Sequence, residues 1–443
     1  MNNIITRQLF FVVFLYTLPV ISSIFWHVNG NLNPEPKVSF GYVVAAEQTK
    51  SVKVPAIRNR VYGQLARAQK LSEEGDVAKS IEVLDAVKER LDSLNSYEIA
   101  MLWNFYGFIY YGNDDIALAT QSFEKVVEQQ AIPNSLRLST LYSLAQLSMQ
   151  QKEYDKAIDH LTTWKGLLDK PITPTQSVLF AQIYYQNKDY KKASYAINEA
   201  VGRVEAEGKV AKENWYILQR AAFYELKMPK EVTLVMEKLV KHFDNPAYWL
   251  QLAGMYAEIG EEKKQLAVME AAWQAGYIED KSQILSLAQL YRYHEAPYKA
   301  AKLLEASIEN GAVTAEVKHL DMLAQAYIAA KEPQKAIPVF KQASQIVENG
   351  EYDAQIAQTY LNSEKWEQAA GYAERAIERG GLEMEGTAYL VLGMAKFNLK
   401  EFESSLQALN KATTFAKSKK TAQQWVKYVE REHAHQLRLA MVR

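Results

Sequence analysis

The sequence predicts an all-α protein, a right-handed superhelical solenoid of about ten helix-turn-helix units that ends in a C-terminal capping helix. Two observations predict this fold. Small and aromatic residues recur together with a period of 33 to 39 residues, which is the period of helix-turn-helix repeats. The chain also has only 19 glycines and 12 prolines in 443 residues, and this deficit favours long helices over turn-rich β structure.

The repeat becomes visible when each unit is numbered so that its small residue takes position 8. Position 8 is Ala or Gly in nine of ten units, position 11 is aromatic in seven, and position 20 is Ala in six and Ser in two. Small residues on both helices let the helix axes approach closely, and we expect the aromatic at position 11 to pack against the next unit. Stacking of neighbours then produces a continuous core. The ten units start at residues 61, 100, 138, 174, 213, 246, 281, 317, 350 and 386.

Two units show the pattern most fully. They match it at Trp103, Gly107, Tyr110, Ala119 and Phe123, and at Trp249, Leu252, Ala253 and Tyr256. The pattern resembles the tetratricopeptide repeat over roughly residues 61–419. Arg220 at position 8 and Gln265 at position 20 depart from it, and we therefore expect a hinge or a longer connection between residues 205 and 245.

The N-terminus of the chain lies outside the repeats. Leu9–Trp26 is a largely apolar run without charge, which is typical of an export signal or a membrane anchor. Small residues at 44–46 fit a cleavage site after Ala46, and an uncleaved anchor is the alternative. Either way, the rest of the chain is expected beyond a membrane. We divide the chain into a signal peptide or anchor with a spacer at 1–46, a lead segment at 47–60, the solenoid at 61–419 and the capping helix at 420–443.

Composition and motifs argue against enzymatic, metal-binding and nucleic-acid-binding functions. The net charge is -1, so no basic field attracts nucleic acid. There is no cysteine, hence no disulfide and no thiolate zinc site. Phosphate-loop, dinucleotide-binding, nucleophile-elbow and zinc-protease motifs are absent from the sequence, and the seven histidines are scattered. We predict a chain that is not an enzyme, with no catalytic residue, metal or cofactor.

The first helix of each unit offers a binding surface. In the tetratricopeptide family, positions 2, 5, 9 and 12 of this helix line the inner, concave side, and we call the surface that they form the first-helix face. Position 9 is Gln in six units, and a row of amides can hydrogen-bond an extended peptide backbone. The alternative is that Gln is simply a good helix former at an exposed position. The six residues are Gln69, Gln146, Gln182, Gln289, Gln325 and Gln358.

The second unit is unusually aromatic. Residues 102–111 contain six aromatic residues, more than the three that core positions 4, 7 and 11 can hold. Phe108 at position 9 and Tyr111 at position 12 are expected on the first-helix face, with Met101 and Asn104 beside them. Aromatic anchors supply much of the binding energy at protein interfaces, so these four residues are the best candidate for a partner site. Extra packing against the first unit is the alternative for each of them.

A narrower similarity suggests a cellular role. Residues 54–76, 101–111 (MLWNFYGFIYY) and 123–133 (FEKVVEQQAIP) resemble tetratricopeptide proteins associated with the TonB energy-transducing systems of Gram-negative bacteria. The resemblance implies a periplasmic scaffold that binds TonB, ExbB or ExbD components and assists uptake of iron chelates, with membrane contact only through the N-terminal segment. Two alternatives remain open, an adaptor in another cell-envelope assembly machine and a small-ligand carrier or enzyme.

Overall fold

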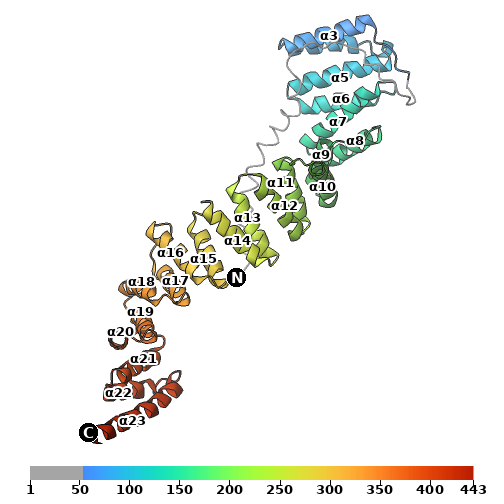
Figure 1. Cartoon of the computed structure of the whole chain (residues 1–443). Helices are drawn as coiled ribbons and strands as arrows, with labels where there is room; N and C mark the ends of the chain where they lie inside the picture. Colours follow the sequence, from blue (N-terminus) through green and yellow to red (C-terminus); the bar gives the residue numbers. More distant parts are fainter. Residues whose placement is uncertain (1–52, 443) are drawn as a thin grey trace.

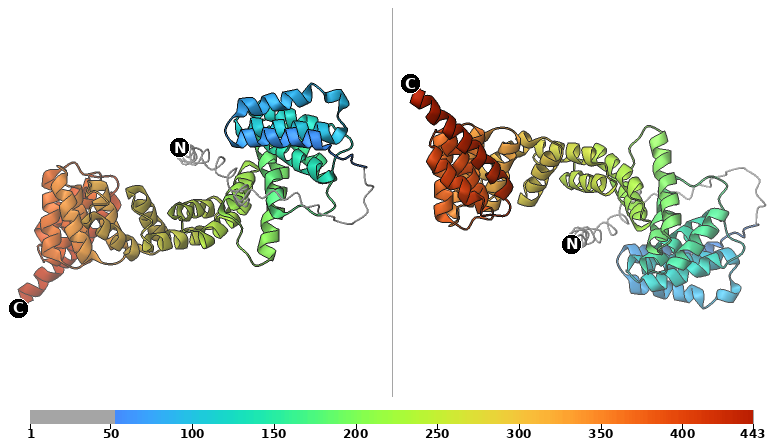
Figure 2. Two further views of the ribbon diagram at one scale, coloured as in Figure 1. Left: turned by 90° about the horizontal axis from the view of Figure 1, so that it is seen from above. Right: turned by 90° about the horizontal axis from the view of Figure 1, so that it is seen from below.

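The computed structural model describes residues 53–442, and the predicted signal or anchor segment at 1–46 lies outside them. Residues 53–442 form helices joined by loops and contain no strand. The helices follow one another along a single elongated array (Figure 1), and two further views show its first and last helix pairs at opposite ends (Figure 2). The predicted all-α solenoid of ten helix pairs and a final helix is confirmed.

Ten first helices alternate with ten second helices along the array. The first helices are α3 (Asn59–Glu73), α5 (Ser96–Gly112), α7 (Asn134–Gln150), α9 (Pro174–Gln186), α11 (Glu213–Glu225), α13 (Pro246–Glu258), α15 (Lys281–Tyr293), α17 (Val317–Ala329), α19 (Glu351–Asn362) and α21 (Glu385–Asn398). The second helices are α4 (Val77–Lys88), α6 (Ile116–Val127), α8 (Tyr154–Gly166), α10 (Tyr190–Ala206), α12 (Pro229–His242), α14 (Glu262–Gln274), α16 (Pro297–Glu309), α18 (Pro333–Ile346), α20 (Trp366–Arg379) and α22 (Phe402–Ala412). A 3-10 turn (Leu91–Ser93) and α23 (Lys419–Val442) complete the set.

A left-handed residue reverses the chain within every pair. Position 15 has φ between 57° and 87° in all ten units, and glycine occupies it only at Gly75 and Gly260. A residue with a side chain costs about 1 kcal/mol in this conformation, so the tight reversal is strained in the other eight units. The second helix then begins at once, and in three units an aspartate at position 16 caps it. The three bonds run from the amides of Lys79, Leu118 and Lys192 to Asp76, Asp115 and Asp189, at 3.0 to 3.1 Å.

Small residues at positions 8 and 20 bring the two helices of a pair together. A Cβ added to Gly107 would lie 2.6 Å from the ring of Phe123, which is itself buried. In the first and last pairs a serine replaces alanine at position 20, and its hydroxyl donates to the carbonyl oxygen of position 8. These bonds join Ser80 to Ala68 and Ser405 to Gly393, each at 2.7 Å.

Tyrosines at position 11 join a helix pair to its neighbours. The hydroxyl of Tyr256 donates to Glu237 at 2.6 Å, and Glu237 belongs to the preceding pair. The hydroxyl at position 11 therefore faces the preceding second helix. Rings at this position also pack towards the next unit, since Tyr110 lies against the cluster that includes Leu144 of α7 and Tyr360 against the cluster that includes Ala395 of α21. The ammonium group of Lys264 lies 5.5 Å from the centroid of the Tyr256 ring. Burial, followed by the nearby carboxylate, raises the pKa of Tyr256 and of its equivalents Tyr291 beside Glu270 and Tyr327 beside Glu305.

The expected hinge region is packed like the rest of the array. The loop at 207–212 is no longer than the loop at 167–173, so the predicted longer connection is absent. One cluster of buried side chains continues from α7 to α13 through Trp215 and Val232. At the far end, Trp425 and Val429 of α23 pack against Phe397 and Leu409. The last helix thus covers the apolar end of the array, as expected for a cap.

Substitution of Gly107 by alanine tests the close approach of the paired helices. We expect Gly107→Ala to destabilise the protein by about 1–3 kcal/mol, because the buried ring of Phe123 must move or the helices must separate. Thermal unfolding followed by circular dichroism measures the change. Gly63→Ala in α3 is the matched control, since no atom lies within 4 Å of an added Cβ there. Equal melting temperatures for the two variants would contradict the prediction.

Candidate functional site

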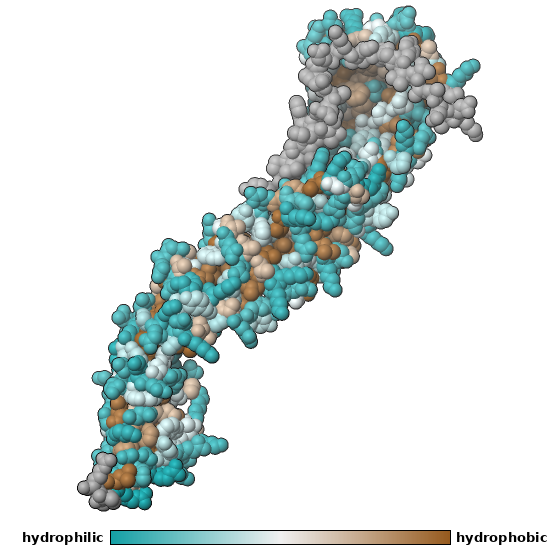
Figure 3. Space-filling view, viewed as in Figure 1, coloured by the Kyte–Doolittle hydropathy of each residue, from teal (hydrophilic) through white to brown (hydrophobic). Residues whose placement is uncertain are grey.

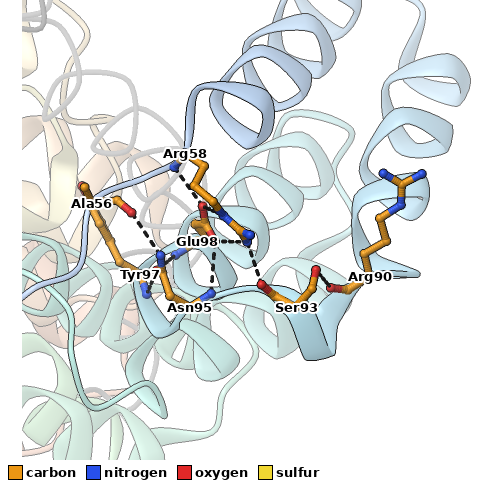
Figure 4. A network of polar contacts seen from close by, with 7 residues as sticks. All are labelled: Ala56, Arg58, Arg90, Ser93, Asn95, Tyr97 and Glu98. Carbon is orange, nitrogen blue, oxygen red and sulfur yellow. Dashed lines mark hydrogen bonds and ion pairs between the residues drawn. The ribbon is translucent and has the colours of Figure 1, made fainter.

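Helix α5 holds the aromatic candidate site, and a buried carboxylate fixes where it begins. The side chain of Glu98 is fully buried and accepts hydrogen bonds from Arg58 Nε (2.9 Å), Arg58 Nη2 (2.6 Å) and the Arg58 amide (2.8 Å), as shown in Figure 4. It also accepts from the amide of Asn95 at 3.1 Å, while Asn95 Oδ1 accepts from the amides of Tyr97 and Glu98. This capping box ties the lead segment to the start of α5.

Three aromatic residues of α5 are used in packing. The hydroxyl of Tyr106 donates to Asp85 of α4 at 2.6 Å, and the Tyr106 ring is buried. Its centroid lies 5.2 Å from that of Trp103 and 5.9 Å from that of Tyr110. The ammonium group of Lys125 in α6 lies 3.8 Å from the centroid of the Trp103 ring, within the range of a cation–π contact. These contacts hold α5 between its two neighbours.

Phe108 is the exposed member of the candidate partner site. Its side chain is 58% exposed, although the ring makes an edge contact with Phe123 at 5.3 Å. Met101, Asn104 and Tyr111 are half-buried. Met101 packs against the core of the first pair and Tyr111 against the core of α6 and α7, where burial raises the pKa of Tyr111. Phe108 can therefore be covered by a partner, and the other three residues support the surface around it.

The six glutamines at position 9 divide into two groups. Three of them donate to another side chain of the protein. These bonds are Gln69 to Glu73 at 2.8 Å, Gln325 to Gln355 at 2.7 Å and Gln358 to Asn362 at 2.9 Å. Within residues 53–442 no hydrogen bond involves the side chains of the remaining three, Gln146, Gln182 and Gln289. Gln289 is exposed and the other two are half-buried, so these three amides can bond to a peptide backbone.

Some consecutive first helices contact one another, which makes their exposed positions neighbours. Such contacts join α3 to α5, α9 to α11, and α19 to α21. Viewed from the side in Figure 3, the array is mostly hydrophilic, with hydrophobic side chains in smaller patches along its middle. An open cavity of about 590 Å³ lies against α15. Its lining residues are Gln289, Arg292, Tyr293, Glu295, Pro297 and Ala329.

Two further observations concern the described part of the chain. It contains no group of three His, Asp or Glu residues placed to hold a metal ion. None of its helices is both long enough and apolar enough to cross a bilayer. The chemistry available on the first-helix face is hydrogen bonding by amides, aromatic contact and local charge.

Two buried carboxylates, Glu98 and Asp353, were not predicted from the sequence. The sequence does contain a signal for the role of Glu98, because a glutamate three residues after Asn95 fits the pattern of a capping box. Asp353 had none. It is fully buried, accepts from Arg379 Nη1 at 2.6 Å and from Ser344 Oγ at 3.1 Å, and lies 3.2 Å from Arg375 Nε. The pairing joins α18, α19 and α20 and became visible only in the structure.

Comparison with known proteins identifies the repeat. Residues 355–419, which run from α19 to α22, match the family model described as tetratricopeptide repeat. These two helix pairs are thus similar to tetratricopeptide repeats. The other eight pairs have the same helix order and the same left-handed residue at position 15. No curated protein matches the sequence.

Solved structures resemble the chain in fold. A tetratricopeptide protein called YrrB, described as having an unusual peptide-binding site, is 16% identical with a TM-score of 0.34, and the match covers 43% of this chain and 96% of YrrB. The tetratricopeptide domain of P58(IPK) is 16% identical with a TM-score of 0.23, covering 77% of this chain and 99% of that domain. A structure of Naa15/Naa10 bound to HypK is 12% identical with a TM-score of 0.40, covering 84% of this chain and 61% of the matched chain.

The buried pair of Arg58 and Glu98 at the start of the array makes stability depend on pH. Hydrogen bonds from Arg58 lower the pKa of Glu98 from 4.5 to about 2. Because the folded protein then binds this proton less readily than the unfolded chain, the stabilisation is complete above pH 4.5 and is lost as the pH falls towards 2. We expect Glu98→Gln to lose about 1–2 kcal/mol at neutral pH, since Arg58 stays partly in water.

Melting temperatures measured between pH 7 and pH 2 test this expectation. The difference between the wild type and Glu98→Gln should shrink as the pH falls below 4.5. Glu128→Gln, at an exposed position, is the control and should follow the wild type throughout. A constant difference between the wild type and Glu98→Gln over the whole range would show that the pair does not titrate as described.

Proposed function

We propose that this protein is a non-catalytic scaffold that binds a segment of another protein on its first-helix face. One observation carries the proposal. Phe108 lies exposed at position 9 of α5, on a helix whose other aromatic residues are occupied in packing. An exposed aromatic ring on a rigid helix is the type of residue that anchors a protein interface.

The polar residues of the same face suit an extended segment. Gln146 and Gln182 occupy in the next two units the position that Phe108 occupies in α5. Each amide provides two donors and one acceptor, which match the N–H and C=O groups of an extended backbone. A partner anchored at Phe108 can therefore continue along α7 and α9. Hydrogen bonds from these glutamines to the partner's main chain would add affinity there and would depend little on the partner's sequence.

We further propose that the scaffold works in the periplasm, as an accessory component of a TonB-dependent uptake system for iron chelates. The apolar run Leu9–Trp26 supports export, and the similarity of residues 54–76 and 101–111 to TonB-associated tetratricopeptide proteins supports the system. TonB, ExbB and ExbD components are the partners that this proposal names. It places Phe108 at or near their contact with the array.

Photo-crosslinking in cells tests the proposal. A photoreactive residue at Phe108 should give covalent adducts with a protein partner, and mass spectrometry should identify a TonB, ExbB or ExbD component. The matched control is a probe at Tyr195, which is 75% exposed but lies on the second helix α10. We expect few or no adducts from Tyr195, because the second helices lie outside the first-helix face.

Other outcomes would revise the proposal at different levels. Adducts from Phe108 with proteins of a different envelope assembly machine would keep the scaffold and reject the TonB role. Equal adducts from Phe108 and Tyr195 would reject the first-helix face as the binding surface.

A further inference from the structure

The fifth helix pair has a cation where the other pairs have a small residue. Arg220 occupies position 8 of α11, a position filled by Ala or Gly in the other nine units. Its side chain is half-buried and passes Met236 of α12, with 3.5 Å between Nη1 and the sulfur atom. Nη1 then donates to Gln251 Oε1 of α13 at 2.6 Å. The guanidinium group thus lies between two successive first helices.

No acidic group neutralises this guanidinium. None of the ion pairs among the described residues includes Arg220. Glu213, on the same helix, instead accepts a hydrogen bond from Tyr248 at 2.6 Å. The bond to Gln251 uses one of the five N–H groups of the guanidinium. Burial without a counter-charge lowers the pKa of Arg220, and a half-buried charge that lacks an anionic partner destabilises the fold.

Position 9 of the first-helix face has its two smallest residues next to Arg220, while position 12 of the same helix is the exposed Tyr224. Position 9 is Ala221 in this unit and Gly254 in the next, whereas six other units have Gln there. No atom lies within 4 Å of a Cβ added to Gly254. The phenol of Tyr185 on α9 is near enough for Arg220 to affect its pKa. Two small residues at position 9 therefore lie beside a cation that has unused donors.

We propose that Arg220 is the centre of a subsite that binds the carboxylate of an Asp or Glu side chain in the partner segment. The planar guanidinium can bind a carboxylate through two parallel hydrogen bonds. Ala221 and Gly254 leave room for the partner's backbone above it. The inference rests on the proposed function, since it assigns a chemical preference to one part of the same face.

A screen of short linear peptides against the full chain tests the proposal. The probes are peptides of random sequence with acetylated N-termini and amidated C-termini, so that only side chains can supply a carboxylate. We expect the bound peptides to be enriched in Asp or Glu at one position. Replacing that residue by its amide should weaken binding by about tenfold or more, as expected for a charge-assisted bond.

Variants of Arg220 locate the effect. Arg220→Met keeps much of the side-chain volume, and Arg220→Ala restores the residue type of most other units; both should lose the acidic preference and bind amide and acid peptides equally. Their melting temperatures should equal or exceed that of the wild type, because the unpaired charge is gone. Arg90→Met, which removes an exposed cation just after the second helix α4, should keep the preference.

Three results would overturn the inference. Bound peptides without acidic enrichment would reject the carboxylate subsite and keep peptide binding. An acidic preference that survives in both Arg220 variants, or a fall in stability of both with unchanged peptide binding, would assign Arg220 a structural role. If the wild type selects no peptide at all, the proposed function fails together with this inference.

Discussion

The whole structure depends on one constraint, that a pair of amphipathic helices cannot cover its own apolar side. Most pairs close on themselves through small residues at positions 8 and 20, and the approach of Gly107 to Phe123 shows how little space remains. The rest of its apolar surface must be covered by the neighbouring pair. Tyrosines at position 11 complete this cover. The bond from Tyr256 to Glu237 gives the buried hydroxyl a hydrogen-bond partner, which it would otherwise lack. The array can therefore end only where another element covers it, as α23 does.

This constraint also explains why the first helices offer a continuous surface. Stacking fixes the second helices against the next pair and brings some successive first helices into contact, so positions 9 and 12 form rows along the array. A row of similar side chains on rigid helices favours an extended ligand over a compact one. Four units interrupt the row of glutamines at position 9. They have Phe108 in α5, Ala221 in α11, Gly254 in α13 and Met394 in α21. Specificity for the partner's sequence is expected at these interruptions, because the repeated glutamines can bond to the main chain of any extended peptide.

The sequence predicted the period, the helix pairs and the cap because these follow from local spacing and residue size. Spacing predicted that position 11 packs against the next unit, but it did not show that the hydroxyl bonds to a carboxylate of the preceding unit. Glu98 and Asp353 were missed because their partners, Arg58 and Arg379, are 40 and 26 residues away. Phe108 was predicted on the first-helix face and lies exposed there, whereas Tyr111 and Met101 are held in packing. Arg220 was visible as a departure from the pattern, but its missing counter-charge required the structure.

The central claim is that partners bind along the first helices. Hydrogen exchange followed by mass spectrometry, with the full chain alone and with the partner recovered through Phe108, tests it most directly. The account predicts slower exchange in α5, α7 and α9 when the partner is bound, with the exposed sides of α6, α8 and α10 unchanged. Slower exchange confined to the second helices would contradict the account, because it would place the interface on the opposite side of the array.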